Sequence, residues 1–289
     1  MQTLRSAPDY TPWTDRVLSR IPGMRPVEGP VFRRDECFAG QMALRDQLYD
    51  ERAEEISALR PEGAAALDEC LGVMLAELRA GGEYTVNDSE VRRPDGVVVS
   101  LSDPLEALAR LVQEDVLLLE GPRGEHRLMG GTLAFPSRWS LRQKLGRNLL
   151  GIHKPVTFYP DNIAPRVQRL FDAMRAGQAL WRMNWIFYPV PDHFTPAHEG
   201  TKLEKGWSET DALYLRCERQ TLFRLPETGA VVFTIKTDIC PIEAVPQEAL
   251  EALPAALRAL PPIEADYKGV EHVLPRVERV LEKLRASVQ

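Results

Sequence analysis

The stretch that decides the fold reads Ala212-Leu-Tyr-Leu-Arg-Cys-Glu-Arg-Gln-Thr-Leu-Phe-Arg-Leu225, then Pro226-Glu-Thr-Gly229, then Ala230-Val-Val-Phe-Thr-Ile-Lys-Thr-Asp-Ile239. Two long runs rich in β-branched and aromatic residues flank a short segment that ends in glycine, which is typical of a β-hairpin. Gly229 can adopt the positive φ that such turns require. We therefore expect two long antiparallel strands that lie side by side.

The second run alternates between two kinds of residue. Its apolar set is Val231, Phe233, Ile235 and Thr237, and its more polar set is Val232, Thr234, Lys236 and Asp238. Successive side chains of a strand point to opposite faces of a sheet. We expect the polar set to lie beside the polar residues of the partner strand, which are Arg216, Glu218 and Gln220. That shared polar face is predicted to line a site.

Helical periodicity brackets the strands. Apolar residues recur three and four apart from Cys37 to Leu59, from Glu62 to Leu78, from Gln247 to Leu260 and from Val270 to Leu284. Ser102 or Asp103 can cap a further helix that has Pro104 at its first position and ends near Glu114. Shorter strands are predicted at Val97–Leu101, Val116–Leu119 and Arg127–Phe135.

Strands linked by hairpins and bracketed by helices predict an α+β fold, and they disfavour alternating βαβ units. We expect an extended lead-in over residues 1–24 and a single domain over 25–289. In that domain, the first helices cover about 37–80, the sheet region about 97–242 and the closing helices 247–285. The chain contains neither the G-x-G-x-x-G nor the G-x-x-x-x-G-K-[ST] phosphate-binding motif.

Composition limits the partners. The 289 residues carry a formal net charge of -6, which disfavours nucleic acid as a partner. No run approaches the roughly 18 apolar residues that span a bilayer, and Met1–Met24 lacks the apolar core of a secretory signal, so we expect a cytoplasmic protein with no membrane partner. The four cysteines lie far apart and are expected to be free thiols without a catalytic role: Cys37, Cys70, Cys217 and Cys240.

One histidine lies among aromatic and basic residues. Phe135-Pro-Ser-Arg-Trp139 is predicted to open a basic helix that Gly151-Ile-His-Lys-Pro155 closes, and Trp181-Arg-Met-Asn-Trp185 follows in a strand. A buried haem needs an axial ligand, apolar walls and cations for its propionates, which makes His153 the candidate ligand and candidate metal-binding residue. The alternative is a histidine held near a helix C-terminus by the dipole or by a carbonyl.

The other four histidines are expected at the surface: His126, His193, His198 and His272. His193 and His198, with Asp192 and Glu199 beside them, form a weak alternative metal site. Their five-residue spacing in an irregular loop fits no helical zinc pattern.

Six blocks of the chain resemble, in the same order, the haem-dependent oxidative N-demethylase α-subunit-like family. The resemblance extends from about Arg25 to about Val273. The blocks are Phe135-Pro-Ser-Arg-Trp139, Lys144-Leu-Gly-Arg147, Ile152-His-Lys-Pro-Val156, Trp181-Arg-Met-Asn-Trp185, Arg216-Cys-Glu-Arg-Gln-Thr-Leu222 and Gly229-Ala-Val-Val-Phe-Thr-Ile-Lys236.

This resemblance implies a PAS-like antiparallel sheet that holds haem b. It also implies a monooxygenase subunit that uses O₂ to remove a methyl group from a small, dimethylamine-like amine. Electrons would come from NADPH through a separate reductase subunit with flavin and a [2Fe-2S] cluster. A non-catalytic PAS-like haem protein that senses O₂, NO or redox state is the alternative, and a pocket protein that has lost haem is a third reading.

Within the resembling blocks, His153 is the implied axial ligand. Four arginines are candidate propionate partners: Arg138, Arg182, Arg219 and Arg224. Trp181 is a candidate haem-pocket wall, and Glu218 and Trp185 are candidates for binding an ammonium group. The ordinary alternative is that these arginines are exposed or paired with carboxylates and that the tryptophans fill the core.

Overall fold

The computed structural model describes residues 2–20, 23–153, 164–197 and 212–287. Its centre is the predicted hairpin of β9 (Tyr214–Arg224) and β10 (Val231–Pro241), which pair along their whole length. The amide of Leu225 donates to the carbonyl of Ala230 at 2.8 Å, and Gly229 has φ of +73°. The hairpin and its turn are therefore confirmed.

The hairpin lies in the middle of a seven-stranded antiparallel sheet of order β1-β8-β9-β10-β6-β7-β2. Its other strands are β1 (Arg25–Pro26), β2 (Ser57–Leu59), β6 (Glu114–Glu120), β7 (Arg127–Thr132) and β8 (Ala179–Tyr188). A small second sheet contains β3 (Thr85–Val86), β4 (Glu90–Arg92) and β5 (Val98–Ser100).

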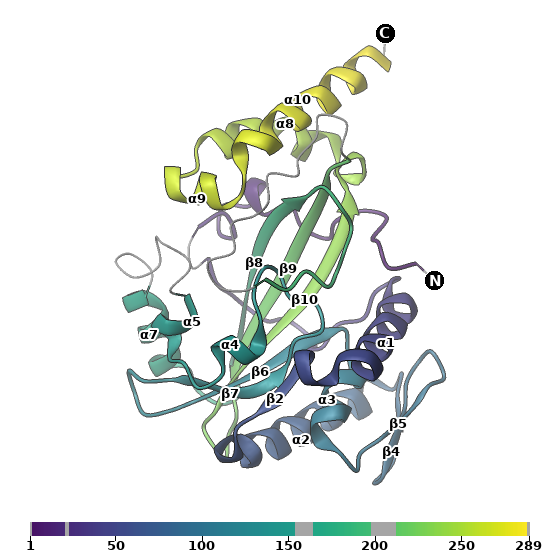
Figure 1. Ribbon diagram of the computed structural model, residues 1–289, viewed down its shortest axis with the longest axis vertical. Coiled ribbons are helices and arrows are strands. Elements are labelled where there is room, and N and C mark those ends of the chain that lie inside the picture. Colours follow the sequence, from purple (N-terminus) through teal and green to yellow (C-terminus); the bar gives the residue numbers. More distant parts are fainter. Residues whose placement is uncertain (1, 21–22, 154–163, 198–211, 288–289) are drawn as a thin grey trace.

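Helices surround this sheet at both ends, as Figure 1 shows. The first group is α1 (Phe38–Ile56), α2 (Ala64–Gly81) and α3 (Pro104–Leu111), and the closing group is α8 (Gln247–Arg258), α9 (Pro262–Tyr267) and α10 (Val270–Ser287). Between them come α4 (Leu141–Lys144), α5 (Leu149–His153) and α7 (Ala164–Ala173), with single-turn helices at Pro12–Thr14, Pro61–Gly63 and Ile242–Ala244. The α+β class is confirmed. Of the helices described, none is long and apolar enough to cross a membrane.

The predicted cap of α3 is also confirmed. The carboxylate of Asp103 accepts from the amides of Leu105 and Glu106, at 2.9 and 3.1 Å, and Pro104 occupies the first turn. The helix ends at Leu111, earlier than the predicted end near Glu114, because Glu114 already pairs with Lys236 as the first residue of β6.

Two other boundaries differ from the prediction. Ser57–Leu59 were expected to continue the first helix, but they form β2, which pairs with Gly130–Thr132 of β7. The predicted basic helix is divided into α4 and α5 by a turn at Gly146, which has φ of +77°. The amide of Gly146 donates to the carbonyl of Leu128 at 2.7 Å, so hydrogen bonding to β7 replaces helical hydrogen bonding here.

The register of the hairpin defines two faces of the sheet. Glu218 lies opposite Thr237 and Gln220 lies opposite Ile235, so these residues share the face on which the neighbouring strand carries Arg182. We call it the His153 face, because α5 packs against it. The expected pairing of Arg216, Glu218 and Gln220 with Lys236 and Asp238 was wrong, since the latter two project to the other side.

The other side is the tryptophan face, which carries Trp181 and Trp185 in β8 and Lys236 in β10. One half of it packs against α2 and α3, and the other half packs against α8, α10 and the N-terminal segment. On the His153 face, residues of β6, β9 and β10 form an apolar cluster with α4, α5 and α7. The sheet therefore separates two buried regions.

Candidate functional site

His153 is the last residue of α5, a short helix that is fixed at both ends. Leu149 and Ile152 pack against Leu222 and Ile235 of the sheet. The amide of Leu149 donates to the carbonyl of His126 at 3.2 Å, which ties the start of the helix to β7. His153 is thereby held beside the His153 face.

The imidazole of His153 is neutral and has a defined tautomer. Its Nδ1 atom lies 2.8 Å from the carbonyl oxygen of Leu149, so Nδ1 carries the proton and donates. Burial lowers the pKa of His153 to about 4, and the charges of Lys144 and Arg182 lower it further, against the opposing effect of the Leu149 carbonyl. The lone pair is thus on Nε2, as a histidine metal ligand requires.

Arg182 supplies positive charge that the described residues neutralise only in part. It projects from β8, and one terminal nitrogen donates to Oε1 of Gln220 at 3.1 Å. Its Nε atom is shielded from solvent and has no hydrogen-bond partner among the described residues. Burial lowers the pKa of Arg182, against the opposing effects of Glu218 and Glu264. A buried guanidinium in this state favours an anion.

Arg138 has a similar unpartnered atom. Its backbone has φ of +61°, which is uncommon for a residue other than glycine. One terminal nitrogen donates to the carbonyl of Tyr267 at 3.1 Å, and the guanidinium lies 4.8 Å from the ring centre of Tyr188. The Nε atom is buried and has no hydrogen-bond partner in the part of the chain that the structure describes. Arg138 is therefore held in a strained conformation with one donor unused.

Glu218 lies on the same face, where its carboxylate accepts from three side chains. Oε1 accepts from Nε of Arg216 at 3.1 Å, and Oε2 accepts from the amides of Asn184 and Gln220, each at 3.2 Å. These donors hold the carboxylate in place. Glu218 therefore contributes a fixed negative charge near Arg182.

Three of the candidate residues lie on the tryptophan face instead. The guanidinium of Arg219 lies 5.2 Å from the ring centre of Trp181, whose other neighbour is Tyr10 at 4.9 Å. Trp185 packs against Trp13 at 5.2 Å, and the ammonium of Lys268 lies 4.1 Å from its ring centre. The structure does not bring Trp181, Trp185 and Arg219 together with His153.

Arg224 is on the His153 face, but backbone carbonyls engage its guanidinium. It donates to the carbonyls of Phe171 and Met174, at 2.6 and 2.9 Å, and to that of Gly229. These bonds satisfy carbonyls at the end of α7. Arg224 therefore holds α7 and the hairpin turn together.

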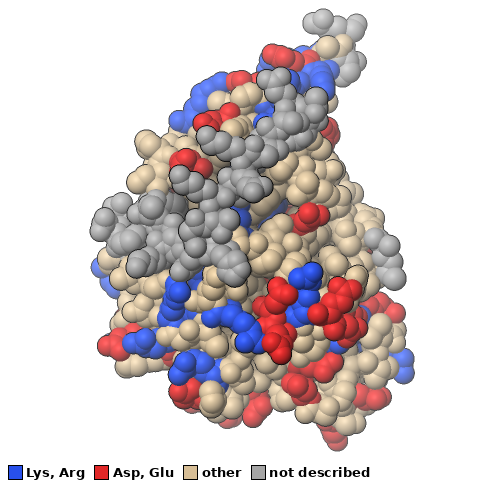
Figure 2. All heavy atoms as spheres, in the orientation of Figure 1, with Lys and Arg blue, Asp and Glu red and all other residues tan. Residues whose placement is uncertain are grey.

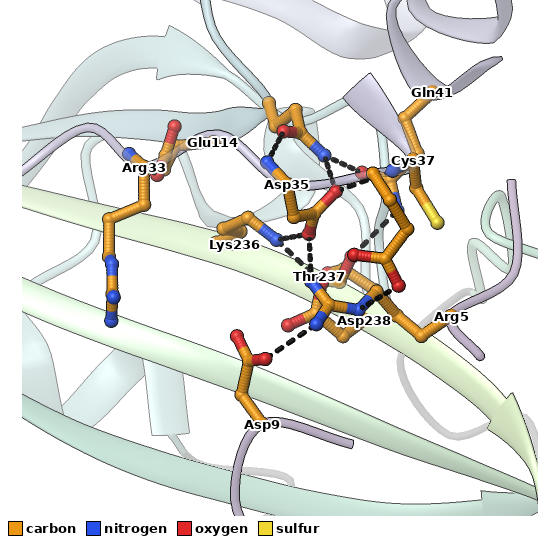
Figure 3. A network of polar contacts seen from close by, with 12 residues as sticks. Arg5, Asp9, Arg33, Asp35, Cys37, Gln41, Glu114, Lys236, Thr237 and Asp238 are labelled. Carbon is orange, nitrogen blue, oxygen red and sulfur yellow. Dashed lines mark hydrogen bonds and ion pairs between the residues drawn. The ribbon is translucent and has the colours of Figure 1, made fainter. Parts of the chain in front are cut away.

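The tryptophan face also contains a closed network of ion pairs, shown in Figure 3. Lys236 lies between Asp238, at 2.6 Å, and Asp35, which Arg5 also contacts at 2.6 Å. Burial alone would raise the pKa of Asp35, but Lys236 and the hydrogen bonds around it hold that pKa well below its usual range. The charges here are neutralised within the chain.

Two histidines expected at the surface are buried, so that expectation was wrong: His126 is 2% exposed and His193 is 3% exposed. His193 packs on Phe135, with ring centres 4.7 Å apart, and burial lowers its pKa to about 3. His198 and Glu199 lie outside the described residues.

Two buried cations are absent from the predicted haem and substrate residues, although Arg216 belongs to the polar strand residues predicted to line a site. Arg216 is fully buried and donates to the carbonyls of Phe135 and His193, at 2.6 and 3.1 Å. Lys268 donates to the carbonyl of Trp185, and burial lowers its pKa to about 8. The resembling block did contain Arg216, but no local pattern distinguishes Lys268 from a surface lysine.

The residues of the His153 face fit haem. They combine a neutral imidazole with its lone pair on Nε2 and an adjoining apolar cluster with two guanidiniums, Arg182 on the face and Arg138 beside Tyr188, each of which has a buried nitrogen without a partner among residues 2–20, 23–153, 164–197 and 212–287. A metal in an apolar macrocycle with anionic substituents requires these three features. The fold and the site thus define a class of α+β protein whose side chains beside the sheet suit an anionic metal cofactor.

The family comparison agrees with this class. The family model for the haem-dependent oxidative N-demethylase, alpha subunit-like, matches residues 28–278. The chain therefore belongs to this family, which confirms the resemblance drawn from its sequence blocks.

Proposed function

We propose that the chain binds haem b through His153 and catalyses oxidative N-demethylation of a small methylated amine. In this reaction O₂, two electrons and two protons convert the N-methyl amine into the demethylated amine, formaldehyde and water. Bound haem would supply the oxygen chemistry, and the protein would supply ligation, orientation and exclusion of water.

The hydrogen bond from Nδ1 of His153 to the carbonyl of Leu149, at 2.8 Å, is the observation that carries this proposal. An imidazolium cannot ligate iron, and burial keeps His153 neutral throughout the physiological pH range. Its Nδ1 proton is held by the carbonyl of Leu149, which fixes the ring orientation and makes Nε2 a better electron donor.

Arg182 and Arg138 are the proposed propionate partners. Each has a buried, unpartnered nitrogen, and an arginine fork binds a carboxylate with both charge and geometry. Arg219 and Arg224 are weaker candidates, because Arg219 lies on the tryptophan face, away from His153, and backbone carbonyls already engage Arg224.

We place the substrate nitrogen on the His153 face. Glu218 is held there by three donors and supplies negative potential toward an ammonium group. For Trp181 and Trp185 we propose indirect roles. Trp181 supports Arg219, and Trp185 holds Lys268 by its ring and by its carbonyl.

The family description names an alpha subunit, which supports a partner subunit. We propose a reductase that carries flavin and a [2Fe-2S] cluster and takes electrons from NADPH. We also propose a cytoplasmic location and a PAS-like pocket. The four buried free cysteines are compatible with a reducing compartment.

The test is formaldehyde release. Haem-loaded protein is supplied with O₂, a chemical reductant and dimethylamine, trimethylamine or methylated amino acids, and formaldehyde and the demethylated amine are measured together. We expect equal amounts of both products from one of these amines, and at least tenfold less from an Arg182→Met variant. An Arg92→Met variant, altered at an exposed strand residue, is the control. A haem-loaded protein that releases no formaldehyde from any amine would favour the sensor alternative.

A further inference from the structure

Positive charge is concentrated around the helix that carries His153. Residues 121–153 and 164–175 contain nine Lys or Arg and two Asp or Glu, in a chain whose net charge is -6. The exposed members of this set belong to β7, α4, α7 and the turns beside them: Arg123, Arg127, Arg142, Arg166, Arg169 and Arg175. We call this surface the basic surface.

Acidic charge is concentrated beside this surface, on α1, where Glu54 lies 3.7 Å from Arg142 of α4. Figure 2 shows Lys and Arg side chains gathered over the region of α4, and Asp and Glu side chains gathered over the region of α1. The acidic side chains of α1 include Asp46, Asp50 and Glu54. One side of the molecule therefore attracts an acidic protein, and the neighbouring side repels it.

An exposed apolar residue lies within the basic surface. Leu150 is 50% exposed, although Leu149, its neighbour in α5, is 5% exposed and packs toward the sheet. The helix thus presents Leu150 to solvent, while its last residue is His153. An apolar contact surrounded by charge is the usual arrangement of a protein interface.

We propose that the basic surface binds an acidic one-electron donor protein. This inference rests on the proposed function, in which the haem held by His153 must receive two electrons from outside the chain. A donor bound over α4 and α5 would lie close to His153, with only one short helix between them. Electron-transfer complexes are small and transient, so steering by charge suits this contact better than a large apolar interface.

A protein partner fits this surface better than a nucleic acid. A nucleic acid backbone needs a continuous basic stripe, whereas here the acidic residues of α1 adjoin the patch. Leu150 at the surface also offers an apolar contact that phosphates do not use.

The test uses an acidic plant-type [2Fe-2S] ferredoxin, chemically reduced, as the probe. Stopped-flow absorption follows reduction of the haem-loaded full chain at several NaCl concentrations. The variant is Arg166→Glu with Arg169→Glu, two exposed arginines of α7, and the control is Arg79→Glu with Arg92→Glu, two exposed arginines of α2 and β4. Both double variants change the net charge by the same amount.

We expect the second-order rate constant at low salt to fall roughly tenfold in the Arg166/Arg169 variant and less than twofold in the control, with a weaker salt dependence in the former. Equal rates in the two double variants, or no reduction of wild-type haem by the ferredoxin, would overturn the inference. Either result leaves the proposed function intact if a neutral chemical reductant still reduces the haem.

Absence of haem from the wild type would instead overturn the proposed function. Binding of an acidic protein to the basic surface is then tested by measuring the affinity of ferredoxin for the haem-free chain at low salt, with the same pairs of variants. Tighter binding of a single-stranded oligonucleotide than of ferredoxin would contradict the assignment of an acidic protein.

Discussion

On the tryptophan face, Lys236 lies between Asp35 and Asp238, and Arg5 completes the network. On the His153 face, Arg182 donates to a neutral amide, and the described residues offer no partner to its Nε atom. Both faces are buried, so both arrangements carry a desolvation cost. The first neutralises its charges within the chain, and the second leaves positive charge beside a neutral imidazole. A bound anion would neutralise that charge.

The largest expected effect is on the tryptophan face. Lys236→Ala leaves Asp35 and Asp238 buried without their shared cation, which is expected to lower the free energy of unfolding by about 3–5 kcal/mol. Urea unfolding followed by circular dichroism measures this change. Arg92→Ala, at an exposed position, is the control and should stay within about 0.5 kcal/mol. A similar small loss for Lys236→Ala would mean that the network does not stabilise the fold.

Replacing Arg182 and replacing Arg224, both on the His153 face, should have opposite effects on the stability of the haem-free protein. Arg224→Met removes the donor from three carbonyls and should cost about 2–3 kcal/mol of unfolding free energy. Arg182→Met removes a partly neutralised buried cation, and it should be neutral or stabilising. Paired urea unfolding curves give both values. A loss for Arg182→Met as large as that for Arg224→Met would show that the chain already neutralises the charge of Arg182, as it does the charges around Lys236.

A smaller effect on the free energy of unfolding is predicted when the pH is lowered. The folded pKa of His193, about 3, lies below its usual value of 6.5, so between these values the unfolded chain binds a proton that the folded chain does not. This group's contribution to stability is complete above pH 6.5 and falls by about 1.4 kcal/mol per pH unit on acidification. Buried acids with raised pKa values, such as Glu114 (about 7) and Asp238 (about 6), act in the opposite direction.

Comparing His193→Gln with wild type therefore isolates the contribution of His193 to the pH dependence of stability. Unfolding free energies at pH 7 and pH 5 should differ less in the variant than in wild type. Equal differences in both proteins would show that His193 does not titrate as its burial implies.

Much of the fold could be predicted from local patterns. The hairpin, the Asp103 cap and the closing helices depend on neighbouring residues, which turn chemistry and periodicity describe well. β2 could not be predicted in this way, because Ser57–Leu59 form a strand only through pairing with β7. The division of the basic helix likewise depends on hydrogen bonds to β7.

The same rules could also have predicted which side chains share each face of the sheet. Trp181 and Arg182 are adjacent in one strand, so alternation places their side chains on opposite faces. Counting outward from the turn at Pro226–Gly229 pairs Glu218 with Thr237 and separates it from Lys236. The burial of His193 and the position of Lys268 depend on tertiary packing, and no local pattern indicates them.

The most direct test of the account is an absorption spectrum of protein produced with added haem. It compares wild type, His153→Ala and His272→Ala, a histidine in α10 that serves as the control. We predict a Soret band in wild type and in His272→Ala. His153→Ala should lose the band and keep the melting profile of the haem-free protein. An unchanged Soret band in His153→Ala, or no haem in the wild type, would contradict it.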